Sequence, residues 1–472
     1  MKIINNAGHL IFLGLLILSG CFFIERMLYA DTAYYLFQMV NNEKLFIEHH
    51  RYSMILLQLL PVMAMKLHLT LKTVILVYSC SIIIVYYSIF CIAVFWLRNY
   101  SAGLIMAFIL ILGVRENFYL PITETHICLV ISTLLFAWVS FSDRFAKKNI
   151  INLTRYLIAA VIICAGLLSH PVAIFAILFL VVYSITDKQE YKDSKGYILT
   201  GMVIILYLLK NFLLRFDSYE EGIISQVHQI KSMLPDLFNL YSAIWFFNHF
   251  TSLYLLPSIM LLIVIIYLTI NKECLKTLVI TFFIVSYLLI SFIAFRQGDS
   301  DIMMEKNFMP VNYFVLVPFV NDVIIKSNLR SILKTGALLF LIVLCFTGIV
   351  RAGSKYRNRI SYIEKILDIS AKYEGKKFII TRENIDINDI MIPWAFSVET
   401  LIFSSVDSPD SARTIYVAKK NELAGTDIKD KKLFLLVNFW LTYRSDHLNP
   451  HYFRIPPGEY RYIEAKNIMN KE

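Results

Sequence analysis

The sequence predicts an α-helical membrane protein that crosses the bilayer repeatedly and ends in a small α/β domain. Hydrophobic residues make up 58% of the 472 residues and charged residues only 17%, which is outside the usual composition of a soluble domain. Apolar runs long enough to cross a bilayer as a helix recur along the first three quarters of the chain. From residue 351 onward the composition returns to that of an ordinary globular domain.

The apolar runs predict about eleven membrane-spanning helices. They lie near 8–29, 72–97, 101–115, 126–142, 153–169, 171–186, 197–215, 250–270, 276–295, 309–324 and 333–351. The first run has the basic start of a signal peptide, but no small-x-small cleavage signal precedes Asp31. We therefore interpret it as a permanent helix.

Lysine and arginine gather in alternate loops, and this asymmetry predicts the orientation in the membrane. The basic loops are at Arg98, 142–149, 187–196, 271–276 and 325–334. By the positive-inside rule they face the cytoplasm, so the amino terminus is inside and the carboxyl-terminal domain outside. The expected location is a cell membrane of the bacterial inner-membrane kind. These loops and the basic tail account for the net charge of +10, and no nucleic-acid partner is expected.

The seven cysteines fall in predicted spans or in an inner loop, and none falls in a predicted external segment. No disulfide framework or cysteine-based zinc site can therefore be read from the sequence, and Cys-x-x-Cys spacing is absent.

Two external stretches are longer than simple turns. In the first, residues 33–46 and 53–69 carry a helix-like apolar pattern and predict helices lying on the membrane interface, with a crossing by 53–69 as the alternative. Pro61 interrupts the second of these segments and makes it short for a span. The second external stretch, 217–250, predicts another interfacial helix and loop with an aromatic anchor.

The chain divides into a predicted membrane domain, 1–352, and an extracytoplasmic α/β domain, 353–472. In the second domain, the pattern of 357–373 predicts a helix. Alternating apolar residues predict strands within 376–382, 413–420, 431–440 and 459–465.

Ionisable groups at the edge of a membrane bundle are costly to desolvate, so they are candidates for function. Asp31 and Glu124 both fall at the predicted outer ends of spans. Facing one cavity, this acidic pair suits proton abstraction or binding of a divalent cation. The alternative is that each side chain caps the helix that follows it. A metal site of Glu124 with His126 is a further alternative without a third fixed ligand.

Cationic and imidazole side chains on the same predicted face suit a phosphate. His49, His50 and Arg51 are adjacent, and an interfacial cluster touching lipid head groups is their alternative role. Three more candidates are His170, which is equally suited to a turn, Arg296, and Lys306, whose alternative is to snorkel to the interface.

Taken in order, these motifs resemble the GT-C glycosyltransferase superfamily, and the nearest patterns are the lipid A aminoarabinose and protein O-mannosyl transferases. The segment 31–34, Asp-Thr-Ala-Tyr, is similar to the acidic motif that ends the family's first span. Glu124 falls where the family has a second acid, and 169–171 falls at its external Lys-Gly-Pro turn, although here the residues are Ser-His-Pro. The segment 306–310 resembles a late Lys-x-x-Tyr-x-x-Pro type motif.

The resemblance implies a GT-C-like fold and transfer of a sugar from a polyprenyl-phosphate-linked donor to a lipid, glycan or protein acceptor at the outer face of the cell envelope. Asp31 would be the base, and Arg51 and Lys306 would meet the phosphate, with His50 or Arg296 as a further option. No cofactor is certain, and a divalent metal ion is one option. The competing hypotheses are a transporter or flippase for a lipid-linked saccharide, and a scaffold whose external domain binds a partner.

Overall fold

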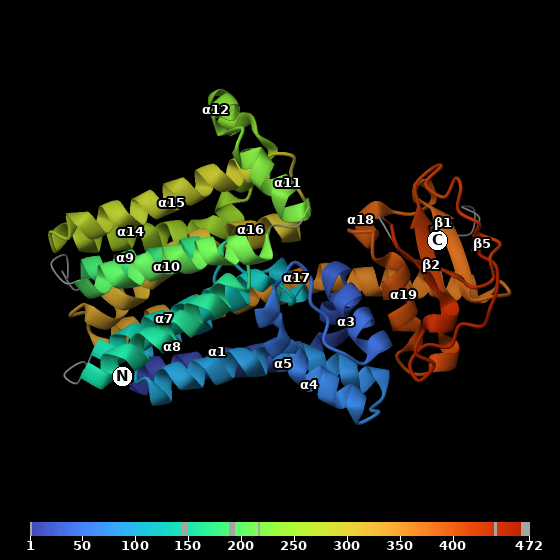
Figure 1. Cartoon of the computed structure of the whole chain (residues 1–472), viewed down its shortest axis with the longest axis horizontal. Helices are drawn as coiled ribbons and strands as arrows, with labels where there is room; N and C mark the ends of the chain where they lie inside the picture. The colour runs from blue at the N-terminus through green and yellow to red at the C-terminus, as the bar shows by residue number, and fades with distance from the viewer. Residues whose placement is uncertain (1, 144–148, 188–193, 216–217, 439–440, 464–472) are drawn as a thin grey trace.

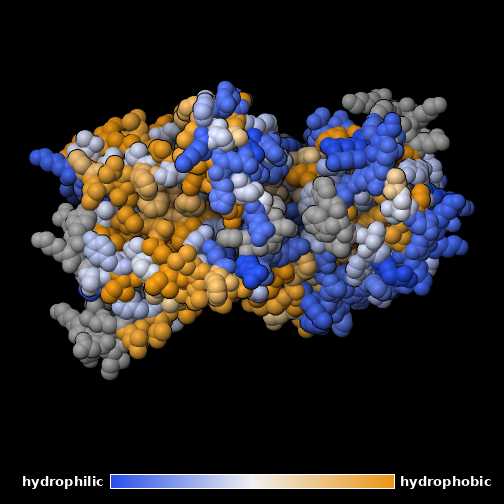
Figure 2. Space-filling model, turned by 45° about the horizontal axis from the view of Figure 1, so that its top comes forward, coloured by the Kyte–Doolittle hydropathy of each residue, from blue (hydrophilic) through white to orange (hydrophobic). Residues whose placement is uncertain are grey.

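The computed structural model describes residues 2–143, 149–187, 194–215, 218–438 and 441–463. Figure 1 shows long helices side by side at one end of the molecule and a small sheet domain at the other. The surface of the helical part is largely hydrophobic in Figure 2, whereas that of the sheet domain is hydrophilic. Because exposed apolar side chains such as Phe212, 80% exposed, are stable only in lipid or at an interface, the helical part has the surface of a membrane domain.

The described part of the chain contains seven helices that are long and apolar enough to cross a membrane. They are Leu71–Trp96, Glu124–Phe141, Ser194–Leu214, Phe250–Ile270, Cys274–Ala294, Asp301–Lys326 and Ser331–Ala371. The predicted spans near 8–29, 101–115, 153–169 and 171–186 fall on shorter apolar helices, Asn6–Cys21, Tyr100–Ile109, Leu153–Leu167 and Ala173–Asp187. A multi-pass membrane protein is therefore supported, but the predicted number of about eleven spans is not confirmed.

The helices of the bundle begin and end as follows. The first group is α1 Lys2–Cys21, α2 Phe23–Met27, α3 Ala30–Asn42, η1 Tyr52–Met54, α4 Ile55–Lys66, α5 Leu71–Cys91, η2 Ile92–Trp96, α6 Tyr100–Ile109, η3 Glu116–Tyr119, α7 Glu124–Asp143, α8 Asn149–Leu167 and α9 Ala173–Asp187. The second group is α10 Ser194–Leu214, α11 Ser218–Val227, α12 Ile230–Met233, η4 Leu234–Asn239, α13 Tyr241–Asn248, η5 Phe250–Tyr254, α14 Leu255–Ile270, α15 Cys274–Ala294, α16 Asp301–Pro318 and η6 Phe319–Lys326.

Side-chain caps fix the start of two bundle helices. Thr70 accepts a hydrogen bond from the backbone of Thr73 ahead of α5, and Asn99 accepts one from Ala102 at 3.0 Å ahead of α6. The long helix Asp301–Lys326, formed by α16 and η6, is the most buried of the seven, with 94% of its most apolar stretch buried. It is therefore the central helix of the bundle. A charged side chain on α16 is therefore surrounded by protein.

The two long stretches that were predicted to be external are helical, as expected. Helices α3 and α4 occupy most of 30–66, and α11, α12, η4 and α13 occupy most of 218–248. Their location at a membrane interface stays a prediction. The alternative role of Asp31 is excluded: it does not cap α3, because the helix begins at Ala30 and the N-cap residue is Tyr29.

A single helix links the bundle to the carboxyl-terminal domain. Helix α17, Ser331–Ala371, has 41 residues and includes both the last predicted span and the helix predicted over 357–373. The predicted domain boundary after residue 352 therefore lies inside an unbroken helix, which extends from the bundle toward the sheet domain in Figure 1. Tyr356 and Arg359, just beyond that boundary, are 1% exposed.

The carboxyl-terminal domain contains two small sheets. Parallel strands β1 Lys377–Thr381, β2 Thr414–Ala418 and β5 Arg461–Tyr462 form one, in the order β2-β1-β5. Antiparallel strands β3 Leu433–Val437 and β4 Leu441–Arg444 form the other. A strand lies in each of the four predicted stretches, whereas β4 and the helices η7 Arg382–Asn384, α18 Ile387–Ile390, α19 Phe396–Ser405, η8 Pro409–Ser411 and η9 Ser445–His447 were not predicted.

Helix α3 joins the two parts of the molecule. It packs against α19, and the Phe37 ring lies 6.2 Å from Phe434 and 5.8 Å from Phe453. Asn41 Nδ2 donates a hydrogen bond to the Tyr443 hydroxyl at 2.9 Å. Residues of α3, the bundle and the sheet domain belong to one hydrophobic core. The carboxyl-terminal domain is therefore packed onto the segment that carries Asp31.

Candidate functional site

Several of the residues singled out from the sequence meet near the start of α3. We call Asp31, Arg51, Glu124, His170 and Lys306 the Asp31 cluster. They come from separate segments: the first turn of α3, the residue before η1, the first residue of α7, the turn between α8 and α9, and the central helix α16. The fold brings these distant positions together where the bundle meets α3.

Glu124 lies between two buried cations. Arg51 Nη1 contacts its Oε1 atom, and Lys306 Nζ is 3.3 Å from its Oε2 atom. The three side chains are 10% exposed or less. Two cations therefore share one acid in a poorly solvated site. Guanidinium and ammonium groups are the side chains that bind phosphate oxygens, so this pair suits an anionic ligand.

Asp31 differs from Glu124 because, in the described part of the chain, its carboxyl is not paired with another side chain. It is half-buried, and among the described residues its carboxyl makes no hydrogen bond or ion pair. Burial raises the pKa of Asp31 above its usual range; Lys306 opposes this shift and Glu124 adds to it. A carboxylate with a raised pKa is a stronger base than an exposed aspartate. Its position therefore suits proton transfer.

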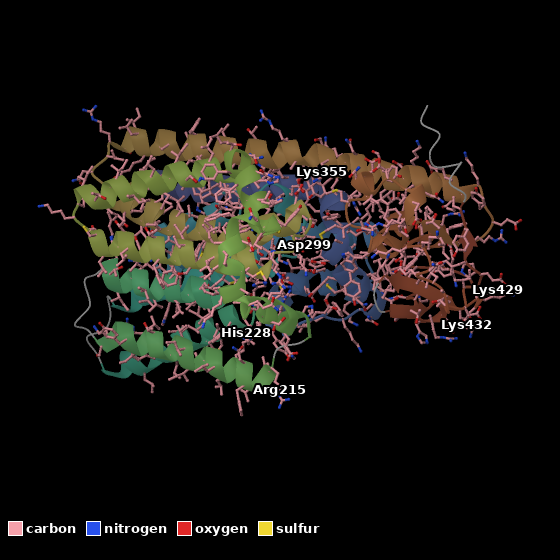
Figure 3. The ribbon with its side chains drawn as sticks, turned by 90° about the horizontal axis from the view of Figure 1, so that it is seen from above. Arg215, His228, Asp299, Lys355, Lys429 and Lys432 are labelled. Atoms are coloured by element: carbon pink, nitrogen blue, oxygen red, sulfur yellow. The ribbon has the colours of Figure 1, made fainter. Side chains whose placement is uncertain are left out.

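Two further carboxylates border this position. Asp299, in the loop before α16, is exposed and helps to raise the Asp31 pKa. Figure 3 places Asp299 near the middle of the long axis, as it does Lys355, whereas Lys429 and Lys432 lie at the carboxyl-terminal end. Glu48 is half-buried, and its own pKa is raised by burial. The neighbourhood of Asp31 thus contains both acidic and cationic side chains.

His170 contributes a neutral ring. Burial lowers the pKa of His170 well below its usual range, and Arg51 lowers it further. Its Nδ1 atom accepts a hydrogen bond from the backbone of Val172 at 3.2 Å, so the ring also holds its own turn, as the alternative role predicted. The same turn fixes the segment after Arg51, because Ser53 N donates to Leu168 O at 3.3 Å.

Glu305, which was not among the predicted site residues, positions the loop that leads to Glu124. Its carboxylate accepts backbone hydrogen bonds from Arg115 at 2.8 Å, Glu116 at 3.2 Å and Asn117 at 3.0 Å. The adjacent residue is Lys306, so one turn of α16 places both the cation and this loop. The signal that could have found it is an acid directly before a lysine in an otherwise apolar helix.

The remaining predicted residues are His49, His50 and Arg296. His49 and His50 have positive φ values, 51° and 56°, which shape the turn before Arg51, and both are half-buried. The His50 ring lies 6.2 Å from that of Tyr52. Arg296 Nη1 donates to Gln229 Oε1 at 2.7 Å, and in the described structure it does not contact the Asp31 cluster.

The side chains of the Asp31 cluster, as the structure places them, do not fit a divalent cation. No group of three or more histidine, cysteine or acidic side chains is placed to hold a metal in the described ranges. Both oxygens of Glu124 face cations, which would repel a metal ion. His126 is two residues further along α7 and points elsewhere. Its Nδ1 atom contacts Thr123 Oγ1, and it lines a cavity of about 20 Å³ beside Arg26.

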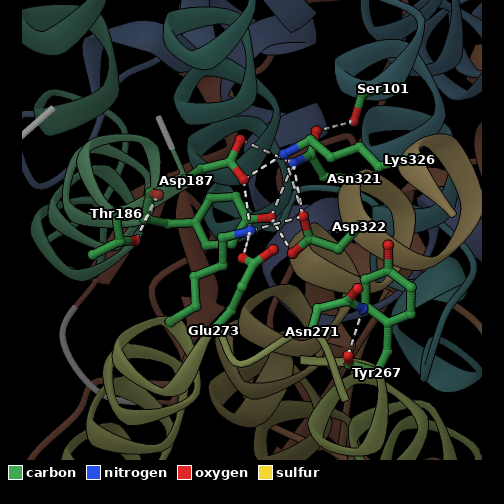
Figure 4. A network of polar contacts seen from close by, with 11 residues as sticks. Ser101, Thr186, Asp187, Tyr267, Asn271, Glu273, Asn321, Asp322 and Lys326 are labelled. Carbon is green, nitrogen blue, oxygen red and sulfur yellow. Dashed lines mark hydrogen bonds and ion pairs between the residues drawn. The ribbon is translucent and has the colours of Figure 1, made fainter. Parts of the chain in front are cut away.

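A second charged cluster lies between other helix ends (Figure 4). We call Asp187, Glu273, Lys276, Asp322 and Lys326 the Asp187 cluster. Lys276 Nζ lies 2.6 Å from Asp187 Oδ1 and 3.0 Å from Asp322 Oδ1, and it also contacts Glu273. Lys326 contacts Asp187 and lies 3.4 Å from Asp322.

Neutral side chains complete this second cluster. The Tyr183 hydroxyl donates to Asp322 Oδ2 at 2.7 Å, and Asn321 Nδ2 donates to that hydroxyl at 3.0 Å. Lys276 and Lys326 belong to loops that were predicted to be basic, but acids neutralise both side chains. These two lysines therefore contribute less to the charge asymmetry that predicts orientation.

No model of a known protein family, no curated protein and no solved structure matches this chain. The resemblance to GT-C glycosyltransferases therefore stays a prediction, and the geometry of the Asp31 cluster is what a functional assignment must rest on.

Proposed function

We propose that the protein is a membrane glycosyltransferase of the GT-C type. It moves a sugar from a polyprenyl-phosphate-linked donor to an acceptor at the extracytoplasmic face, with Asp31 as the general base. One observation carries this proposal: the half-buried Asp31 carboxyl, which makes no hydrogen bond or ion pair in the described part of the chain, lies near two buried cations that share the acid Glu124. A base next to an anion site is what transfer from a phosphate-linked sugar requires.

The reaction follows from this arrangement. The acceptor oxygen forms a bond to the anomeric carbon, and its proton passes to the Asp31 carboxylate. The bond from that carbon to the phosphate oxygen breaks, and the lipid phosphate leaves. Arg51 and Lys306 stabilise the negative charge that develops on the phosphate.

Glu124 has a different role from that of Asp31. Because it contacts both cations, it acts as their counter-ion and holds them near the reacting phosphate. Glu124 was predicted to be catalytic together with Asp31, but the contacts of Glu124 with two cations support a binding role. His170, kept neutral by burial, fits beside a phosphate without adding charge.

Direct binding of polyprenyl phosphate tests the anion site. The experiment compares wild type with Arg51→Ala in detergent, and adds Arg115→Ala as a matched control. Arg115 contacts the Ser252 carbonyl instead of an acid of the cluster. We expect Arg51→Ala to weaken binding by about tenfold, since a charge-assisted hydrogen bond is lost. Equal affinity in wild type and Arg51→Ala would remove Arg51 from the site.

Transfer itself is tested with a panel of polyprenyl-phosphate-linked sugars and with lipid, glycan and peptide acceptors in vesicles. Loss of the sugar from the lipid phosphate, detected by mass spectrometry, supports the proposal. Movement of the intact lipid-linked sugar across the vesicle membrane without bond cleavage would instead support the flippase hypothesis.

A further inference from the structure

The turn that carries Asp31 is held by residues far away in the sequence. Ala30 N donates a hydrogen bond to Glu399 Oε1 at 2.7 Å. Arg359 Nη1 donates to Leu28 O at 2.7 Å, and its guanidinium lies 4.7 Å from the centre of the Tyr29 ring. Each of the three residues before Asp31 is therefore fixed by a side chain from α17 or α19.

The side chains of Arg359 and Glu399, which hold this turn, also contact each other. Arg359 Nη2 contacts Glu399 Oε2, and Arg359 Nε donates to Ile390 O at 2.9 Å. Arg359 is 1% exposed and Glu399 is 0% exposed. Every nitrogen of the guanidinium and both oxygens of the carboxylate have a partner, so a movement of this buried ion pair would leave a buried charge less well compensated.

The backbone at this turn needs such support. Ala30 has a φ of 42°, in the left-handed region that residues other than glycine rarely adopt. Strained positions of this kind persist only where surrounding contacts determine them. The hydrogen bond from Ala30 N also satisfies one of the amide groups that a helix leaves free in its first turn.

We propose that Glu399, oriented by Arg359, is a positioning residue for Asp31, and that the carboxyl-terminal domain completes the reactive site by holding the turn of residues 28–30. This inference rests on the proposed role of Asp31 as the base. The carboxyl-terminal domain then has a function: by holding this turn, it directs the Asp31 carboxyl toward the cations of the Asp31 cluster. A small displacement of a reacting group lowers the rate strongly, so the contact acts on catalysis as well as on folding.

A matched pair of double variants isolates the contact. Arg359→Met with Glu399→Gln and Arg359→Met with Glu399→Leu both remove the buried charges, so neither leaves an unpaired ion. Only the glutamine variant keeps an acceptor for Ala30 N. Asp407→Asn is the control for domain docking, because it breaks the exposed Lys72–Asp407 ion pair, 3.0 Å, which lies between α5 and the carboxyl-terminal domain.

The readout is labelling of Asp31 by a hydrophobic carbodiimide, which reacts with protonated carboxyl groups, followed by peptide mass spectrometry over a range of pH. Lys306, Arg51, Glu124, Asp299 and Glu48 surround Asp31 and are unchanged in every variant. We expect Asp407→Asn to label with the wild-type pH midpoint. The glutamine variant, which keeps the acceptor for Ala30 N but loses the Arg359 contacts, should stay closer to that midpoint than the leucine variant does. The leucine variant should label with a midpoint closer to that of a free aspartate, about 3.9.

Transfer kinetics complete the test. The leucine variant should lose about 10²-fold in kcat relative to the glutamine variant, with the KM for the donor within about twofold, since the phosphate cations are untouched. Identical labelling and kcat in the two folded double variants would overturn the proposal. If wild type transfers no sugar but the labelling midpoints still differ, the positioning role holds and the proposed function fails.

Discussion

The two charged clusters differ in how completely their groups are paired. In the Asp187 cluster each carboxylate contacts a lysine, and a tyrosine and an asparagine complete the network. In the Asp31 cluster Glu124 is shared by two cations, while Asp31 has no partner among the described residues. Burial of charge between membrane helices is thus not by itself a sign of function. An incompletely paired group is the more specific indicator.

The clusters also differ in the segments that form them. The Asp187 cluster joins the ends of long bundle helices, α9, α15 and η6. The Asp31 cluster depends on turns, and its Asp31 turn is held from outside the bundle by Glu399. A site built on turns must be held by its surroundings, whereas an ion network between helix ends can hold those helices together.

The largest effect is expected for Asp31→Asn, which keeps the shape of the side chain and removes the base. Sugar transfer should fall by about 10² to 10⁴-fold while the protein still folds. Single-turnover transfer from a polyprenyl-phosphate-linked sugar measures this, with Asp236→Asn, an exposed acid of η4, as the control. Near-normal turnover in Asp31→Asn would show that the Asp31 carboxyl is not the catalytic base.

The reciprocal change in the other cluster is Asp322→Asn. Asp322 is 1% exposed and bonds Lys276, Lys326 and Tyr183. Removing its charge should reduce the free energy of unfolding by about 3 kcal/mol, because the buried Lys276 loses a partner. Denaturant unfolding in micelles measures the loss, and polyprenyl-phosphate binding should be unchanged. Unchanged stability with lost binding would reverse the roles that we assign to the clusters.

A smaller effect is expected for Lys306→Met, which keeps the aliphatic length and removes the charge 3.3 Å from Glu124. The apparent KM for the lipid-linked donor should rise by about tenfold, since one cation of the phosphate site is lost. Steady-state kinetics over a range of donor concentrations measure this. If kcat fell instead with KM unchanged, Lys306 would act on the transition state alone.

The raised pKa of Asp31 also predicts a pH-dependent stability. A carboxyl whose pKa is higher in the folded than in the unfolded state contributes stability at low pH, which is lost as pH rises through the folded pKa. Asp31→Asn should therefore unfold about 2 °C above wild type at pH 8, and this advantage should disappear at pH 4. Thermal unfolding at both pH values tests the sign; a constant difference would contradict it.

The smallest effect is expected for Lys432→Ala at the far end of the carboxyl-terminal domain. Its Nζ atom is 3.2 Å from Asp446 Oδ2, but the side chain is 51% exposed. Because water and salt screen an exposed pair, the unfolding midpoint and the transfer rate should both stay at wild-type values. A clear loss of either would show that exposed charges matter here as much as buried ones.

The sequence predicted much of the local structure and several of the residues that meet in the Asp31 cluster. Polar residues at the ends of apolar runs must lie near the same side of a bundle, which is why Asp31, Glu124 and Lys306 were selected together. The same reasoning selected Arg296, which contacts Gln229 instead. Position along a span gives the depth of a side chain but not its direction around the bundle axis.

Sequence alone determined that the chain is helical and apolar for three quarters of its length, and that strands follow, because hydropathy and periodicity are properties of single segments. Only the tertiary structure decided the pairings: Glu124 with Arg51 and Lys306, the acids that neutralise Lys276, and Glu399 with the turn before Asp31. Ala30 and Glu399 are separated by 369 positions, and no local pattern connects them. Contacts between distant segments are set by how their surfaces pack, and that geometry is not written in any one stretch of residues.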